Sequence, residues 1–102
     1  MRLKRVSDDI KRELKNPEFA RAFNEELTRL RFAHQLAETR EKAHLTQTAV
    51  AKKMGVSPQV VSRIEGGSLN LTLRTIFKYA RSVGSELAFS LRPSRSGRVS
   101  AK

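Results

Sequence analysis

The chain has 102 residues, and its 21 lysine and arginine residues against 10 acidic ones give a formal net charge of +11. This length predicts one small domain with tails. The absence of cysteine excludes disulfides and thiolate metal sites, and with only two histidines we expect neither a metal nor a cofactor. No apolar run approaches the length of a membrane span and no signal peptide is apparent, so we expect a cytoplasmic protein.

The N-terminal segment predicts a short helix. Residues 1–6 have no cap and no helical period, so they fit either a disordered segment or a short strand. The sequence Ser7-Asp8-Asp9 marks a helix start, because acidic side chains are favoured at the positive end of a helix dipole. We expect this helix to end near Lys15.

A long helical pattern follows the first helix. Asn16-Pro17 combines a capping residue with proline at the first helical position. Apolar residues then recur at helical spacing, and a later apolar set lies on a shifted face. The pattern over residues 17–43 is long for a globular helix, so it fits one helix with two tasks or two helices bent near Leu30. The first apolar set is Phe19, Phe23, Leu27 and Leu30, and the second is Phe32, Leu36 and Ala43.

Residues 46–65 predict two short helices joined by a glycine turn. Thr46 can cap the first helix, Gly55 can end it, and Ser57 with Pro58 can open the second. The residues expected to face inward are Val50, Ala51, Met54, Val56, Val61 and Ile64. Those expected on the outer side of the second helix or its flanks are Gln59, Val60, Ser62 and Arg63. This arrangement predicts a helix-turn-helix, whose second helix enters the major groove of DNA.

The charge distribution agrees with a polyanionic partner. Residues 1–30 have 8 basic and 6 acidic residues, a net charge of +2, whereas residues 31–91 have 9 and 4, a net charge of +5. The acidic residues are therefore concentrated away from the helix-turn-helix. Basic side chains bind nucleic acid by neutralising phosphates and releasing counterions. We expect residues 30–43 to be the first helix of the DNA-binding domain, covering the core of the helix-turn-helix.

A further helix is expected to close the core. Thr72 can cap it and Gly84 can end it. Five apolar residues recur at helical spacing between them and are expected to point inward. These are Leu73, Ile76, Phe77, Ala80 and Val83.

The segment after this helix alternates apolar and polar residues. Residues 86–91 have the period of two that predicts a strand, and Pro93 ends it. A single strand needs a partner, which could be the same strand of a second copy, residues 1–6 or another protein. We favour a homodimer, with Leu87, Phe89 and Leu91 at the contact. The basic tail that follows is expected to be flexible.

The spacing of one residue series resembles the XRE (Cro/C1-type) helix-turn-helix family. That series is Gln47, Ala51, Gly55, Val56, Ser57, Ser62 and Glu65. The resemblance implies a mainly α fold, a helix-turn-helix bundle with an N-terminal helical extension and a short C-terminal β-strand. The corresponding regions are residues 1–29 for the extension, 30–92 for the DNA-binding domain with its strand, and 93–102 for the tail.

The flanking segments narrow the resemblance. NPEFARAFNEELTRL, LAETREKAHLTQ and LRTIFKYARSVGSELAFSLRP look similar to HigA-type antitoxins of toxin–antitoxin operons, over roughly residues 7–92. This resemblance implies a homodimer that represses its own operon by binding a palindromic operator. It also implies direct neutralisation of a RelE/HigB-like toxin, an mRNA-cleaving ribonuclease. Such a toxin would be contacted by the extension, for which the candidate residues are Asp8, Asp9, Glu13, Phe19 and Phe23.

The resemblance also implies roles for single residues in DNA binding. Gln47 would contact a phosphate and Ser68 the DNA backbone. Gln59 would read a base edge, because its amide can pair two ways with adenine, and Val60 would touch a thymine methyl group. Ser62 and Arg63 would contact bases or phosphate, beside Ser57 and Pro58 at the helix start.

A structural ion pair is also implied. Arg40 and Glu65 match a pair that joins the first helix to the end of the recognition helix in phage repressors. One departure from the family is His44, which stands where the family has a glycine, so this loop could differ in conformation.

Three other functions compete with the antitoxin. The main alternative is a stand-alone XRE-type repressor of a phage or mobile element, with no toxin partner. A toxin-neutralising module without DNA binding fits the basic helix-turn-helix less well. An enzyme fits least, because Ser57, Ser62, His34 and His44 offer no base–nucleophile–orienter set.

Overall fold

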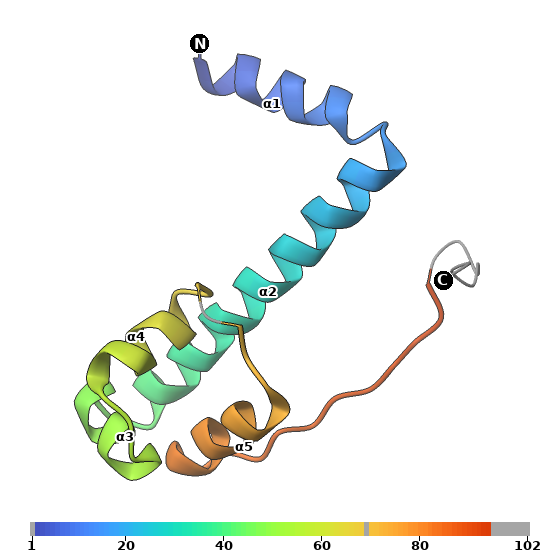
Figure 1. The fold of residues 1–102 in the computed structure, drawn as a ribbon. Helices are drawn as coiled ribbons and strands as arrows, with labels where there is room; N and C mark the ends of the chain where they lie inside the picture. Colours follow the sequence, from blue (N-terminus) through green and yellow to red (C-terminus); the bar gives the residue numbers. More distant parts are fainter. Residues whose placement is uncertain (1, 69, 95–102) are drawn as a thin grey trace.

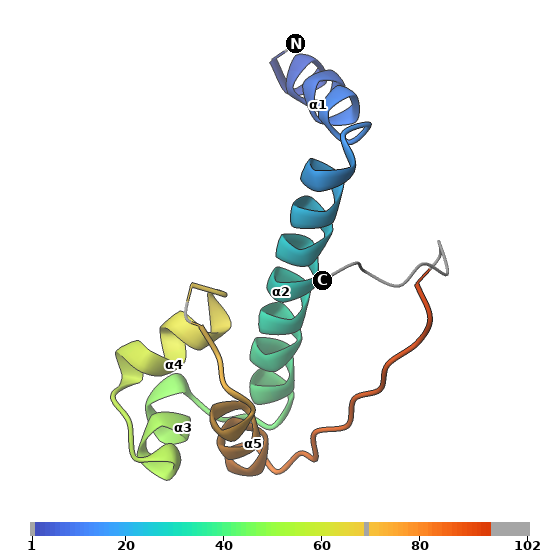
Figure 2. The same ribbon diagram turned by 45° about the vertical axis from the view of Figure 1, so that its right-hand side comes forward.

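The computed structural model describes residues 2–68 and 70–94, with side chains from residue 8 onward. The described part is helical, with α1 over Arg2–Glu13, α2 over Pro17–Lys42, α3 over Gln47–Met54, α4 over Pro58–Glu65 and α5 over Leu73–Ser82. The C-terminal half of α2 gathers with α3, α4 and α5 at one end of the molecule (Figure 1). The N-terminal half of α2 and α1 project away from this bundle, as both views show (Figures 1 and 2). None of the helices in the described part combines the length and apolar character needed to cross a bilayer.

The first helix begins earlier than expected. It starts at Arg2, so the prediction of a disordered segment or a strand over residues 1–6 is wrong for the described residues 2–6. Arginine, leucine and lysine have good intrinsic helix propensity, and a helix can extend through them without a capping residue. The helix ends at Glu13, close to the expected Lys15.

The second helix is continuous through its 26 residues. Asn16 caps it as predicted, its side-chain oxygen accepting from the backbone N–H groups of Glu18 at 2.9 Å and Phe19 at 3.4 Å. Its buried residues are Ala33 and Leu36, both in the C-terminal half. Of the two alternatives, one continuous helix is therefore correct, and its two tasks stay a prediction.

The hydrophobic core lies between the C-terminal half of α2 and the three short helices. Helix α3 packs on α4 and α5, and α2 packs on α4. The helix-turn-helix thus buries its apolar face against both flanking helices, as predicted. The buried core residues are Leu36, Val50, Ala51, Met54, Val61, Ile64, Tyr79 and Val83, and those packed at its margin are Phe32, Leu45, Val56, Val60 and Leu71.

Each of the helices α2 to α5 is followed by a residue with left-handed backbone. These residues are His44, Gly55, Gly67 and Gly84, with φ angles of 60°, 75°, 72° and 73°. At His44, the backbone N–H groups of His44 and Leu45 return to the carbonyls of Glu41 at 3.0 Å and Arg40 at 3.2 Å. This is the pattern in which a glycine commonly ends a helix. His44 therefore adopts the left-handed backbone that favours glycine, although it carries a side chain.

Helix α5 presents a different face to the core than expected. Leu73 and Phe77 were predicted to be buried, but they are 54% and 43% exposed. Tyr79, which the prediction left out, is completely buried, beside Ala80 and Val83. Ile76, Tyr79, Ala80 and Val83 have the spacing of one helix face, so the true inner face is turned from the predicted one.

The predicted strand is not formed. Residues 85–94 have no regular secondary structure, and Phe89 and Leu91 are highly exposed. Of the three partners considered, the N-terminal residues 2–6 are taken up in a helix, and a second copy or another protein lies outside a single chain. The strand prediction is therefore wrong for the single chain, because a strand needs a neighbour for its backbone hydrogen bonds. Of the predicted tail, residues 95–102 lie outside the described residues.

Candidate nucleic-acid interface

Helix α4 has one buried side and one polar, exposed side. Val61 and Ile64 are fully buried, whereas Gln59, Ser62 and Arg63 are exposed, as the sequence predicted. The side chain of Val60 packs partly against the core. It therefore lies on the flank of α4, between the core and the exposed face.

The start of α4 differs from the expected cap. Ser57 occupies the capping position with extended backbone, but its side chain makes no capping hydrogen bond. The backbone N–H of Val60 instead donates to the carbonyl oxygen of Ser57 at 3.0 Å. Pro58, the first helical residue, has no N–H to satisfy. The hydroxyl of Ser57 is therefore an exposed polar group beside the polar face of α4.

The end of α4 is fixed by a carboxylate with four hydrogen bonds. Glu65 Oε2 accepts from Arg40 Nε at 2.7 Å and from the hydroxyl of Tyr79. Glu65 Oε1 accepts from Arg40 Nη2 at 3.0 Å and from Gln47 Nε2 at 2.9 Å. We refer to Glu65 with Arg40, Gln47 and Tyr79 as the Glu65 cluster. It joins α2, α3, α4 and α5, so each helix of the bundle contributes one residue.

Within the Glu65 cluster, the side chains of Glu65 and Arg40 are nearly closed to solvent, and both remain charged. The side chain of Glu65 is 6% exposed and that of Arg40 is 12% exposed. Burial alone would raise the pKa of Glu65, but the hydrogen bonds from Arg40, Gln47 and Tyr79 outweigh this and hold its pKa below its usual value. The hydrogen bond to Glu65 raises the pKa of Arg40. The predicted ion pair is therefore present, charged on both sides and structural in its contacts.

Tyr79 was not predicted as part of this cluster. Its hydroxyl also lies 3.0 Å from the carbonyl oxygen of Leu36 in α2. Burial, followed by the neighbouring carboxylate of Glu65, raises the pKa of Tyr79, so the phenol stays protonated. The signal in the sequence was the position of Tyr79, three residues after Ile76 and four before Val83, on the inner face of a helix.

Gln47 is half-buried at the first turn of α3, because its side chain is bound to Glu65. The preceding residue Thr46 caps α3 as predicted, its hydroxyl oxygen accepting from the N–H of Ala49 at 3.0 Å. The structure therefore adds a contact that the sequence did not indicate. The predicted phosphate contact of Gln47 stays a prediction.

Ser68 lies in the turn after α4 and is exposed. Its backbone N–H donates to the carbonyl of Arg63 at 3.2 Å, which holds the turn close to the helix. The preceding Gly67 is packed against α2, where an added Cβ would lie 2.9 Å from Leu30 Cδ2. The structure thus places Ser68 at the end of α4 that faces α2.

The predicted toxin-contacting residues lie apart from this face. We call residues 2–31 the N-terminal arm, which comprises α1 and the N-terminal half of α2. Its residues Asp8, Asp9 and Glu13 are exposed, and the rings of Phe19 and Phe23 stack with centroids 5.9 Å apart. Asp9 pairs with Arg12 at 3.1 Å, so the charges of the arm are mixed rather than purely acidic.

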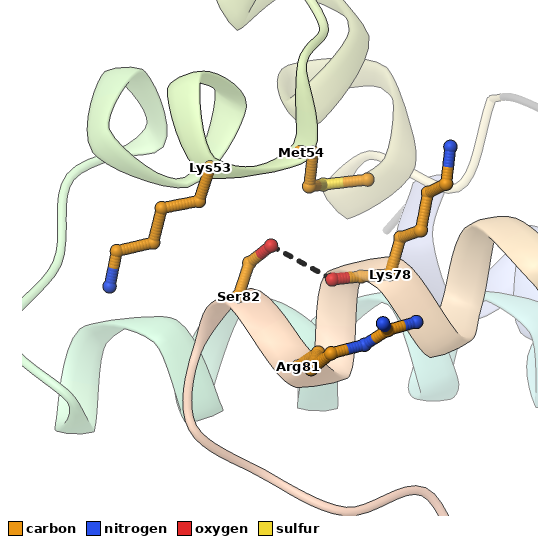
Figure 3. A pocket seen from close by; sticks show the side chains of 5 residues that line it. All are labelled: Lys53, Met54, Lys78, Arg81 and Ser82. Atoms are coloured by element: carbon orange, nitrogen blue, oxygen red, sulfur yellow. Dashed lines mark hydrogen bonds between the residues drawn. The ribbon is translucent and has the colours of Figure 1, made fainter.

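A basic hollow of about 330 Å³ lies between α3 and α5. Its lining residues are Lys53, Met54, Lys78, Arg81 and Ser82. Figure 3 shows the charged end of Lys53 pointing away from those of Lys78 and Arg81. Cations near the C-terminal ends of helices are favoured by the helix dipole, which accounts for their position. Because the charged groups do not converge, we assign no ligand to this hollow.

The comparison with known families agrees with the geometry of α3 and α4. A family model described as helix-turn-helix matches residues 36–89, just over half of the 102 residues. Searches of curated proteins and of solved structures gave no match. The match begins at Leu36, in the C-terminal half of α2, and includes the Glu65 cluster and α5. The chain therefore belongs to the XRE-type helix-turn-helix family.

Proposed function

We propose that the chain is a sequence-specific DNA-binding antitoxin, which binds an operator as a homodimer and neutralises a RelE/HigB-like toxin. The observation that carries the DNA-binding part is the exposed polar face of α4, anchored at its far end by the buried carboxylate of Glu65. A recognition helix must keep its position while its outer side chains lose water, and the ion pair of Glu65 with Arg40 of α2 holds the end of α4 in place. The net charge of +5 over residues 31–91, from 9 basic and 4 acidic residues, attracts DNA.

The DNA-binding part can be tested without knowing the operator. A duplex would be selected from a random pool with the wild-type chain, and its affinity measured for Gln59→Ala. We expect the variant to bind the selected duplex about tenfold more weakly and to lose preference at one base pair. Gln35→Ala, an exposed glutamine on α2, is the matched control and should bind as the wild type does. Failure to select any sequence would refute the proposed function.

The homodimer is supported by the exposed extended segment. Leu87 is half-buried, while Phe89 and Leu91 alternate with polar residues and are exposed. A second copy could pair its own segment with this one and cover both side chains. Two recognition helices would then read half-sites about 34 Å apart. We expect Phe89→Asp to convert a dimer to a monomer in light scattering, whereas Ala88→Asp on the opposite side of the segment should leave it dimeric.

The antitoxin part is supported by the N-terminal arm. The stacked Phe19 and Phe23 lie on a projecting helix that the bundle does not cover (Figure 2). An apolar side that the described bundle leaves uncovered suits another protein. The experiment is co-expression with a neighbouring reading frame of RelE type, and recovery of both proteins in equal amounts. Phe19→Ser with Phe23→Ser should release the partner and restore growth arrest, while operator binding stays unchanged.

The stand-alone repressor is the second candidate, and the charge of the arm favours it. The N-terminal arm, residues 2–31, carries 9 basic and 6 acidic residues, so it lacks the strong negative charge that would suit a basic toxin. In such a repressor the arm would contact the second copy. The same double substitution would then weaken the dimer and operator binding together, and no partner would be recovered.

A further inference from the structure

We propose that Glu65 is a positioning residue for DNA binding, which orients the amide of Gln47 so that one N–H faces a phosphate. This inference rests on the proposed function, in which Gln47 contacts the DNA backbone. Glu65, at the buried end of α4, would thus determine which amide group of Gln47 the helix α3 presents to DNA. This role of Glu65 is additional to its ion pair with Arg40.

The direction of the Gln47 amide follows from the charge of its partner. Glu65 Oε1 lies 2.9 Å from Gln47 Nε2 and 3.0 Å from Arg40 Nη2. The hydrogen bonds hold the pKa of Glu65 below its usual value, so the carboxylate is ionised at neutral pH. An ionised carboxylate can only accept hydrogen bonds. The amide must therefore turn its nitrogen, and not its oxygen, toward Glu65.

This orientation leaves a defined donor for DNA. The amide nitrogen has two hydrogens, and one of them is given to Glu65. The second has no hydrogen-bond partner in the part of the chain that the structure describes. A phosphate oxygen can only accept, so this second N–H is the group that it would bind. A glutamine free in solvent would lose rotamer freedom on binding, whereas Gln47 is already held in place.

The two oxygens of Glu65 serve different neighbours, which provides a matched control. Oε1 holds Gln47, while Oε2 accepts from Tyr79. Tyr79→Phe removes a hydrogen bond of the Glu65 cluster without touching the oxygen that orients Gln47. A loss of stability can thus be separated from a loss of orientation.

The test is a double-mutant cycle in operator affinity. It uses the duplex selected by the wild-type chain, with Gln47→Ala, Glu65→Gln, the double variant and Tyr79→Phe. Unfolding curves for each protein establish that it is folded at the assay temperature. We expect Gln47→Ala and Glu65→Gln each to weaken binding roughly tenfold. The double variant should bind no more weakly than Gln47→Ala, because both substitutions remove one contact. Tyr79→Phe should lower the unfolding midpoint and leave affinity within about twofold.

Two results would overturn the inference. Independent effects, so that the double variant is roughly a hundredfold weaker, would show that Glu65 does not act through Gln47. An equal loss of affinity in Tyr79→Phe would show that Glu65 acts through stability alone. Both results leave selection of a duplex by the wild-type chain intact, so they are distinct from a failure of the proposed function.

A second measurement needs neither a variant nor DNA, and so covers the case in which Glu65→Gln does not fold. In the free wild-type chain, NMR reports the rotamers of the Gln47 side chain and the exchange of its two amide hydrogens with solvent. We expect one rotamer, with one hydrogen exchanging more slowly than the other. Averaged rotamers with equal, fast exchange would refute the positioning role. Gln35, exposed on α2, is the internal reference for an unrestrained glutamine.

Discussion

Arg40 of α2 holds Glu65 of α4 through two hydrogen bonds, 2.7 Å from Nε and 3.0 Å from Nη2, although 25 positions separate them in the chain. Two nearly buried charges lose much hydration, and their mutual attraction offsets this only when the geometry is good. Removing one partner leaves the other charge buried and unpaired. Substitution of either residue should therefore lower the stability of the fold.

We expect Arg40→Met to lower the free energy of unfolding by about 3 kcal/mol, measured by urea denaturation. Arg12→Met is the control, because the ion pair of Arg12 with Asp9 is exposed and worth less than about 1 kcal/mol. An unchanged urea midpoint for Arg40→Met would contradict the structural role of the pair.

The pH dependence of stability follows from the lowered pKa of Glu65. A carboxylate whose pKa is lower in the folded chain contributes stability above its unfolded pKa of about 4.3. That contribution is lost as the pH falls through the folded pKa. Glu65→Gln cannot titrate, so the difference in unfolding free energy between wild type and variant should shrink as the pH falls below about 4. A difference that stays constant from pH 7 to acid would show that Glu65 has an ordinary pKa.

His44 has left-handed backbone with a φ of 60°, which costs a residue with a side chain about 1 kcal/mol. We therefore expect His44→Gly to raise the free energy of unfolding by roughly that amount, seen as a rise of about 4–8 °C in Tm. His34→Gly, within α2, should lower stability by about 1 kcal/mol instead. A stability loss at position 44 would mean that the histidine side chain makes a stabilising contact.

Gly67 and Gly84 share a positive φ but differ in their surroundings. An added Cβ at Gly67 would lie 2.9 Å from Leu30 Cδ2, whereas at Gly84 no atom of the described residues lies within 4 Å of such a Cβ. We expect Gly84→Ala to cost about 1 kcal/mol from the backbone alone, and Gly67→Ala about 2 kcal/mol because Leu30 must also leave its rotamer.

The two contributions at Gly67 can be separated by a second substitution. In a Leu30→Ala background, the cost of Gly67→Ala should fall to that of Gly84→Ala, since the clashing methyl group is gone. An undiminished cost in that background would place the clash elsewhere. Urea denaturation of five proteins measures these free energies of unfolding: the wild type, Gly84→Ala, Gly67→Ala, Leu30→Ala and the double variant with Leu30→Ala and Gly67→Ala.

Local signals in the sequence were enough to predict the helix-turn-helix. A glycine that ends a helix and apolar residues at helical spacing depend on neighbours within a few positions, so Gly55 and Val61 were assigned correctly. The inner face of α5 was not, because Leu73 and Phe77 share its apolar character while packing turns Tyr79 inward. The spacing of apolar residues predicts that a helix has an apolar side. Which residues of that side face the core depends on the helices that pack against it.

The candidate site shows the same division. The pairing of Arg40 with Glu65 was predicted from a resemblance, whereas the contacts of Gln47 and Tyr79 with the same carboxylate were not. These contacts join residues from three helices, α3, α4 and α5, and spacing along a chain contains no information about such contacts. The strand over residues 86–91 failed for a related reason, since residues 2–68 and 70–94 of the single chain offer it no backbone partner.

Because α2 is one continuous helix, it fixes the distance between the aromatic residues near its start and the helical bundle. With a rise of 1.5 Å per residue, Phe19 lies about 21 Å along the axis from Ala33, where the helix enters the core. A protein bound to the stacked rings of Phe19 and Phe23 would therefore be separated from the helix-turn-helix by this length of α2. We expect a small partner and a duplex to occupy the chain simultaneously. Because α2 is continuous, it also fixes the direction in which the aromatic rings face relative to the bundle. That direction determines which side of the DNA the partner occupies.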